Sequence, residues 1–195
     1  ATPALSPLPA QRATAWVALA SSSAALHLLR FLEREAGELL SAFEVLSEAA
    51  FRSTTRRGAN LRAPFPESCS FQRAALLEFS TCLRGERLCL EDLLLDVLEG
   101  FATAHEDRVA EICPQPPSDA WDLRHQVSEC IRDEGPLVAL DISVPRSAIA
   151  EFSDSICGEI EDRFAGARVF DFGHWGDGGS HINVAFPSEE ARGAQ

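Results

Sequence analysis

The sequence predicts an α+β fold in which ferredoxin-like repeats form an antiparallel sheet with helices packed on one face. Three observations predict this class. Short apolar segments alternate with amphipathic segments, and the order strand, helix, strand occurs twice before a proline-rich break at 114–117. A similar alternation resumes after the break. We therefore expect one domain over residues 1–195, built from two halves of about 10–113 and 118–187.

In the first half, the apolar run 13–20 indicates a buried strand. Ser21–Ser23 supply the N-cap of a helix that ends near Ala36. Glu44 is expected to precede the next helix, where its negative charge interacts favourably with the positive end of the helix dipole. The remaining expected elements are a strand over 38–43, a helix over 45–50, a loop over 52–67, a strand over 71–80, a helix over 88–103 and a strand over 107–113.

In the second half, Ser118 can cap a helix whose inward residues are Trp121, Val127 and Ile131. The segment 137–144 reads as a buried strand, and its one acid, Asp141, then needs a partner. The expected elements that follow are an amphipathic helix over 147–165, a strand over 168–172 and a glycine-rich hairpin.

The net charge of −13 argues against nonspecific nucleic-acid binding, which requires a basic surface. No apolar run reaches the ~18 residues that span a bilayer. The six cysteines form no CxxC motif, so we expect reduced, mostly buried thiols in an intracellular, cytoplasmic protein. The chain begins at Ala1 and contains no methionine, from which we expect a piece of a longer polypeptide.

The hairpin carries the clearest chemical motif. His174 and His181 flank a turn that contains Gly176, Asp177 and Gly178. Two neutral imidazoles held in this way can share one divalent metal ion. Asp177 is a further ligand, an anion that orients a histidine, or a turn residue. The alternative is a glycine-rich hairpin with two ordinary histidines.

Several segments occur in an order that resembles a known family. They are Leu-Ser-Ala-Phe-Glu (40–44), Leu-Leu-Glu (76–78), Ala-Trp-Asp-Leu-Arg (120–124), Leu-Asp-Ile-Ser-Val-Pro (140–145) and Gly-His-x-Gly-Asp-Gly-x-x-His-x-Asn (173–183). The chain resembles the C-terminal, or cap, domain of FAD-linked oxidases related to D-2-hydroxyglutarate, D-lactate and glycolate dehydrogenases. Those flavoenzymes have the vanillyl-alcohol-oxidase type of FAD fold.

The resemblance implies a role for five residues. His174 and His181 would bind a divalent metal, usually zinc in the hydroxyglutarate branch, which polarises the substrate hydroxyl. Arg124 would clamp a substrate carboxylate, and Ser128 and Asn183 would contact the substrate. Hydride would pass from the substrate to FAD.

Three departures from the family pattern matter. Gly179 replaces an asparagine that is common after Gly178, and Ala139 replaces a lysine, which weakens the case for a second substrate carboxylate. The family's third metal ligand and catalytic histidine lie in a Glu-His-Gly segment beyond the hairpin. This sequence has no such segment, so we expect no catalytic residue in it.

The main hypothesis is therefore a substrate-binding domain of an FAD-dependent D-2-hydroxyacid oxidoreductase, inactive alone. Its FAD-binding domain would lie outside this chain and would be its partner, and no FAD-binding residue is assigned here. Two alternatives belong to other classes. One is a ferredoxin-like subunit that only associates with a separate FAD protein, and the other is a metal-binding regulatory module that works without flavin.

Overall fold

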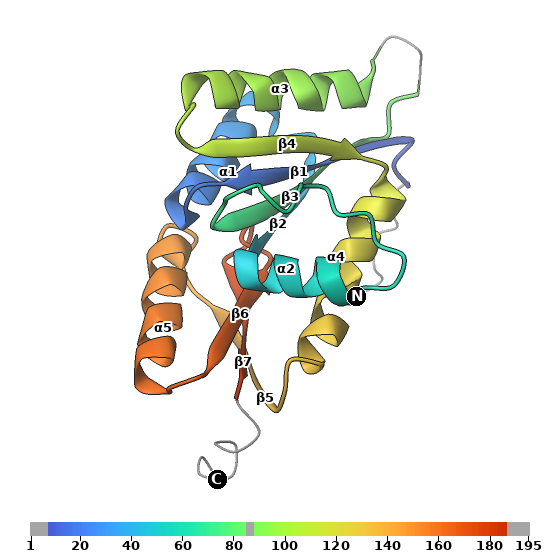
Figure 1. The fold of residues 1–195 in the computed structure, drawn as a ribbon. Helices are drawn as coiled ribbons and strands as arrows, with labels where there is room; N and C mark the ends of the chain where they lie inside the picture. The colour runs from blue at the N-terminus through green and yellow to red at the C-terminus, as the bar shows by residue number, and fades with distance from the viewer. Residues whose placement is uncertain (1–7, 85–87, 187–195) are drawn as a thin grey trace, which may run out of the picture.

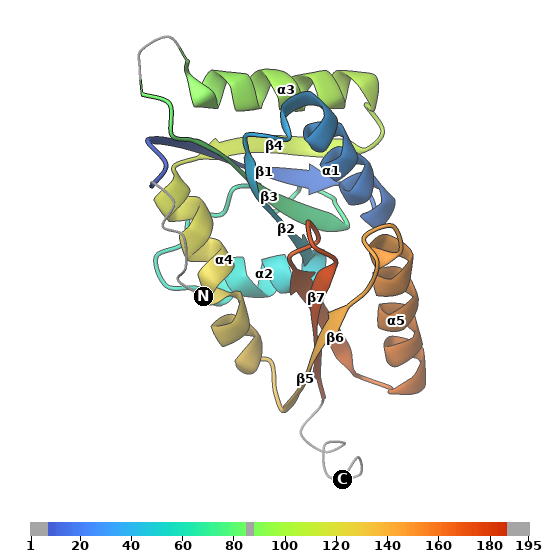
Figure 2. The same cartoon turned by 180° about the vertical axis from the view of Figure 1, so that it is seen from behind.

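The computed structural model describes residues 8–84 and 88–186, which form one sheet with helices on it (Figure 1; Figure 2). The strands are β1 (Gln11–Leu19), β2 (Leu40–Ser47), β3 (Arg73–Thr81), β4 (Val109–Gln115), β5 (Leu137–Ser143), β6 (Arg168–Gly173) and β7 (Gly179–Ala185). The helices are α1 (Ser22–Ala36), α2 (Glu48–Arg57), α3 (Leu90–Ala104), α4 (Pro117–Arg132) and α5 (Ile149–Arg163). Neighbouring strands run antiparallel in the order β4-β1-β3-β2-β6-β7-β5, which confirms the α+β class and the antiparallel sheet.

The first four strands have ferredoxin-like topology. Their spatial order is β4-β1-β3-β2, with α1 between β1 and β2 and α3 between β3 and β4 along the chain. This is the split βαβ arrangement, in which a strand lies between two parallel strands joined by a crossover helix. Helix α2 is an addition to that pattern, placed between β2 and β3.

The later strands repeat part of the same pattern. Strands β5 and β6 are joined through α5, and β7 lies between them and pairs with both. Within the described residues this part contributes three strands to the sheet rather than a second set of four. The two parts join where β2 pairs with β6, through Val45 opposite Gly173 and Leu46 opposite Phe172.

Helices cover both faces of the sheet, so the prediction of helices on one face is wrong. On β1, Ala15 and Val17 belong to a core shared with α1 and α3, whereas Trp16 and Ala18 belong to a core shared with α2 and α4. The apolar run of β1 is continuous rather than alternating, which is the pattern of a strand buried on both faces.

The predicted helix over 45–50 and loop over 52–67 are also wrong in part. Strand β2 continues to Ser47, whose hydroxyl accepts a hydrogen bond from the Ala50 amide at 3.3 Å and so caps α2. Helix α2 then runs to Arg57. The two threonines of this segment donate hydrogen bonds back to the helix, as Thr54 does to the Ala50 carbonyl at 2.8 Å.

Strand β5 was predicted to be buried, and it is instead an exposed edge strand. Val138 and Leu140 are 48% and 40% exposed. Helix α4 differs from its prediction at Trp121, which was expected to point inward and is half-buried. Residues of β5 and of α4 line one pocket, which is described below.

A buried polar network fixes β3 against α1, α5 and β6. Arg73 is 4% exposed, and its guanidinium donates to Asp171 at 2.8 Å and to Ser153 at 2.7 Å. Asp171 also accepts from Ser153 and Ser180. The buried charges are therefore paired and hydrogen-bonded, as a charged group in a protein interior requires.

Glu134 anchors the end of α4 to its neighbours. Its side chain is 3% exposed and accepts hydrogen bonds from Ser53 and Arg57 of α2, at 2.6 Å and 3.0 Å, and from Arg168 of β6. Burial alone would raise the pKa of Glu134, but these hydrogen bonds outweigh burial and hold the pKa at about 2.

Replacing Glu134 with glutamine should destabilise the domain at neutral pH and have little effect in acid. The folded-state pKa lies below the ordinary value of 4.5, so the contribution to stability is present above pH 4.5 and is lost as the pH falls toward 2. We expect Glu134→Gln to lower the free energy of unfolding by about 2 kcal/mol at pH 7, measured by urea denaturation. Glu129→Gln removes an exposed carboxylate of α4 and is the matched control. A Glu134→Gln deficit that persists unchanged to pH 2 would contradict this account.

Candidate functional site

A pocket of about 360 Å³ lies between α4 and the strands β5, β6 and β7. It brings together Arg124, Ser128 and Asn183, which the resemblance implies as substrate-binding residues, and His181, one of the two predicted metal ligands. The other residues that line it are Arg132, Leu137, Ala139, Asp141 and Phe172.

Strand pleat and helix spacing explain why these side chains meet. In the sheet, Asp141 of β5 and Phe172 of β6 both lie opposite His181 of β7, and directly paired residues point to the same face. Arg124 and Ser128 are four residues apart on α4, so they share one face of that helix. The helix face and the sheet face enclose the pocket.

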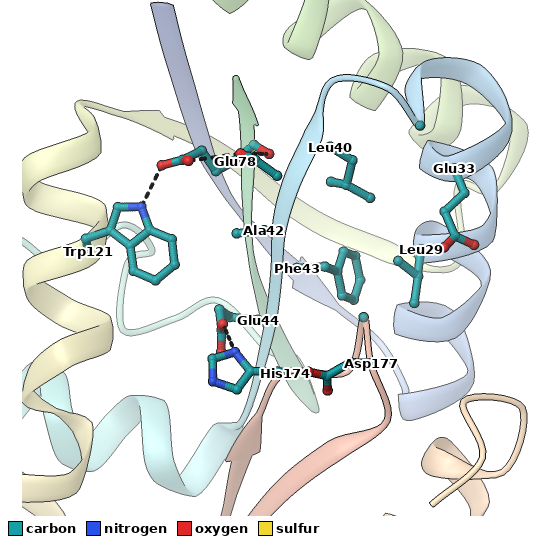
Figure 3. Close-up of a pocket in the computed structure, with 13 residues that line it drawn as sticks. Leu29, Glu33, Leu40, Ala42, Phe43, Glu44, Glu78, Trp121, His174 and Asp177 are labelled. Carbon is teal, nitrogen blue, oxygen red and sulfur yellow. Dashed lines mark hydrogen bonds and ion pairs between the residues drawn. The ribbon is translucent and has the colours of Figure 1, made fainter. Parts of the chain in front are cut away.

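A second pocket, of about 520 Å³, lies beside His174 (Figure 3). Its polar lining includes Glu44, Glu78 and Trp121, and the Trp121 indole donates to Glu78 at 2.8 Å. The His174 and His181 rings are 6.1 Å apart between centroids. Since each histidine lines a different pocket, the pair lies at the boundary between the two.

Glu44 holds two of the candidate groups at once. It is 2% exposed, one of its oxygens pairs with His174 Nδ1 (Figure 3), and the other accepts from Arg124 Nε at 2.8 Å. The expected role at a helix start is wrong, because Glu44 lies within β2 and points to the α4 face. Sequence reasoning noted the segment that contains Glu44 but missed this function.

Asp141 orients the second histidine in the same way. It pairs with His181 Nδ1, although its side chain is 85% exposed rather than buried as predicted. A carboxylate can only accept a hydrogen bond, so in each neutral imidazole the proton lies on Nδ1 and the lone pair on Nε2. Asp177 does not take this role, because its carboxylate accepts from the Gly179 amide at 2.9 Å and so acts as a turn residue.

These two histidines fit two positions of a divalent-metal site. An imidazole whose Nδ1 is held by a carboxylate and whose Nε2 is free is the usual form of a metal-ligating histidine. Across residues 8–84 and 88–186, however, no group of three or more His, Cys, Asp or Glu side chains is placed to hold a metal. Zinc sites use three or four protein ligands, so these two histidines alone would not complete one.

Arg124 is restrained but keeps donors to spare. Its side chain is 11% exposed, its Nε is bound to Glu44, and its guanidinium carbon lies 5.1 Å from the centre of the Phe172 ring. A guanidinium has five N–H donors, four of them on the two terminal nitrogens. No described residue bonds those terminal nitrogens, so they can donate two hydrogen bonds to a carboxylate ligand in a bidentate manner.

The hairpin is held in place by a glycine and a tryptophan. Gly178 has φ +87°, and a Cβ at this position would lie 2.2 Å from the Val144 carbonyl oxygen. Trp175 is fully buried in the core beside α1, and the guanidinium of Arg73 lies 5.4 Å from its ring. His174, the preceding residue, therefore remains on the surface beside Glu44.

The cysteines take no part in either pocket, whose linings contain none. The prediction of mostly buried thiols is wrong, since one is buried, three are half-buried and two are exposed. Burial raises the pKa of Cys157 to about 12, so this thiol stays protonated near neutral pH.

Comparison with known proteins agrees with this architecture. Residues 8–195 match the family described as FAD linked oxidases, C-terminal domain. The chain belongs to this family, which confirms the resemblance seen in the sequence.

The similar curated proteins are D-2-hydroxyglutarate dehydrogenases. The protein from Stutzerimonas stutzeri (strain A1501) is 31% identical over 156 residues, which cover 76% of this chain and 31% of the relative. The mitochondrial protein from Arabidopsis thaliana is 29% identical over 159 residues, which cover 81% of this chain and 27% of the relative. The chain thus spans less than a third of the length of these two relatives.

A solved alkyldihydroxyacetonephosphate synthase shares the fold, with a TM-score of 0.52 and 8% sequence identity over 96% of this chain and 39% of that one. Among the helices of residues 8–84 and 88–186, none has both the length and the apolar character needed to cross a bilayer.

The carboxylate contacts predict which nitrogen of each imidazole is protonated. At pH 8, long-range ¹H–¹⁵N spectra should show His174 and His181 with the proton on Nδ1. Glu44→Gln should change the tautomer ratio of His174 and leave that of His181 unchanged, and Asp141→Asn should do the reverse. The two variants are controls for each other. A proton on Nε2 of both wild-type histidines would contradict the assignment.

Proposed function

We propose that this chain is the substrate-binding domain of an FAD-dependent oxidoreductase that oxidises a D-2-hydroxyacid. The observation that carries the proposal is the meeting of Arg124 and His181 over one pocket, with His174 beside them. Family membership and the names of the curated relatives support the same reaction class.

The residues of the chain bind and orient the acid. The terminal nitrogens of Arg124 receive the carboxylate next to the hydroxyl-bearing carbon. Ser128 and Asn183, which line the same pocket, contact the substrate from the helix side and the sheet side. Glu44 keeps the Arg124 guanidinium at a fixed distance from His174.

His174 and His181 would hold a divalent metal, for which zinc is our candidate, together with ligands from outside the described residues. Such a metal, when bound, would supply the lowered pKa of the substrate hydroxyl, and FAD would supply the acceptor for the hydride. The chain's own contribution is to present two oriented Nε2 atoms beside the acid-binding pocket. None of the described residues is proposed as the base that takes the proton of the substrate hydroxyl.

The proposal also places FAD on another part of the polypeptide, so the isolated chain should bind the acid without oxidising it. We propose an intracellular location for the same protein. Some curated relatives are described as mitochondrial, and a mitochondrial compartment is therefore the alternative to the cytoplasm.

Substitution of the histidines tests the proposal. In the flavoprotein that contains this chain, His174→Ala and His181→Ala should each lower turnover of the D-2-hydroxyacid by on the order of 100-fold or more, because each removes a metal ligand. Bound FAD, measured by absorbance, should not change. His125→Ala removes an exposed histidine of α4 that lines neither pocket, and it should keep full activity. Full turnover in both His174→Ala and His181→Ala would refute the proposed role.

A further inference from the structure

A second arginine of α4 lines the candidate pocket and is not used by the proposed function. Arg132 follows Arg124 and Ser128 at intervals of four residues, so all three lie along one side of the helix. With a rise of about 1.5 Å per residue, the Cα atoms of Arg124 and Arg132 are about 12 Å apart. Their two side chains therefore enter the pocket from different ends of the same helix face.

The two arginines differ in what already holds them. Arg124 is largely buried and bonded to Glu44. Arg132 is exposed and forms no ion pair or hydrogen bond with any residue in the described part of the chain. Its guanidinium is therefore available to a ligand in a protein whose net charge is −13.

The charged side chains that line the pocket favour an anion. The other charged or titratable side chains of the pocket are Arg124, Asp141 and His181. Asp141 is the one carboxylate among them, and it is paired with His181. From β5, Leu137 and Ala139 also line the pocket, and they bring no charge. An acidic group that entered the pocket could therefore bind Arg132, a cation with no ion-pair partner among residues 8–84 and 88–186.

The position of Arg132 is fixed by the residues that follow it. Glu134 is two residues further along and is bonded to Ser53 and Arg57 of α2 and to Arg168 of β6. The C-terminal end of α4 is thus anchored on two sides. Arg132 is the last residue of α4 and is followed at once by this anchored segment, which suits a residue that discriminates between ligands.

We propose that Arg132 determines specificity by binding a second, distal carboxylate of the 2-hydroxyacid while Arg124 binds the first. This inference rests on the proposed function. It also reverses an expectation from the sequence, because Ala139 removes a cation from β5 while Arg132 supplies one to the same pocket from α4. The substrate class is then a dicarboxylic 2-hydroxyacid.

The test compares two probes with the same five-carbon backbone, D-2-hydroxyglutarate and D-2-hydroxypentanoate, which lacks the distal carboxylate. In the flavoprotein that contains this chain, Arg132→Gln should lower kcat/KM for the diacid about tenfold. The value for the monoacid should stay within about twofold. Arg132→Lys should retain part of the preference, because it keeps the charge but loses the bidentate geometry.

Two further variants sharpen the result. Arg132→Gln combined with Ala139→Lys returns a cation to the pocket from β5, and it should restore most of the preference for the diacid. Arg30→Gln removes an exposed arginine of α1 that is not in the pocket, and it should leave the ratio of the two probes unchanged. Equal losses for both probes in Arg132→Gln, or no loss for the diacid, would overturn the inference.

Calorimetry separates this inference from the proposed function. The probes are glutarate and pentanoate, which bind without being oxidised. If the flavoprotein oxidises neither hydroxyacid but binds glutarate in preference to pentanoate, and Arg132→Gln removes that preference, the proposed function fails and the role of Arg132 stands. If it oxidises D-2-hydroxyacids and Arg132→Gln leaves both preferences intact, the role of Arg132 fails alone.

Discussion

The buried carboxylate of Glu44 is the contact on which the candidate site depends. It joins a histidine of the hairpin to an arginine of α4, two groups 50 positions apart in the chain (124 and 174). An ion pair this buried adds little net stability, since desolvation offsets most of the attraction, but loss of one partner leaves a costly unpaired charge. Glu44 therefore acts mainly by positioning His174 and Arg124 rather than by stabilising the fold. Glu44 lies next to the β2–β6 ladder, so the pairing that joins the two parts of the sheet also assembles the site.

The two arginines of α4 differ in how firmly other side chains hold them, and both can bind an anionic ligand. Arg124 is held by Glu44 and by the Phe172 ring, so its remaining donors have a fixed direction. Arg132 is unpaired among the described residues, yet it projects from a helix end that Glu134 anchors. Behind the sheet, the Arg73 network supports Trp175 and with it the hairpin. Rigid packing on one face thus supports ligand chemistry on the other.

Much of the fold could be predicted from local pattern, because long periodic segments such as α3 and α5 reveal their buried faces directly. The errors arose where tertiary contacts decide. Leu46 suits a helix as well as a strand, and pairing with Ala74 and Phe172 selects the strand. The continuous apolar run of β1 indicates a strand that is covered by helices on both faces. It was interpreted only as evidence that the strand is buried. The family motif pointed to His174, His181, Arg124, Ser128 and Asn183, and the structure brings four of these five residues into one pocket, while His174 lines the other. The role of Glu44 could not be predicted, since its partners Arg124 and His174 are distant in sequence. The role of Arg132 could have been suggested, because Arg132 follows Ser128 by four residues and so lies on the same face of the helix.

The central claim is that one face of the sheet, beneath α4, binds the hydroxyacid between an arginine and a histidine pair. A crystal structure of the flavoprotein that contains this chain, grown with Zn²⁺ and D-2-hydroxyglutarate, tests it most directly. The account predicts the acid between α4 and β5–β7 with a carboxylate on the terminal nitrogens of Arg124, and zinc anomalous density on Nε2 of His174 and His181. Acid bound away from this face, or zinc without contact to either histidine, would contradict it.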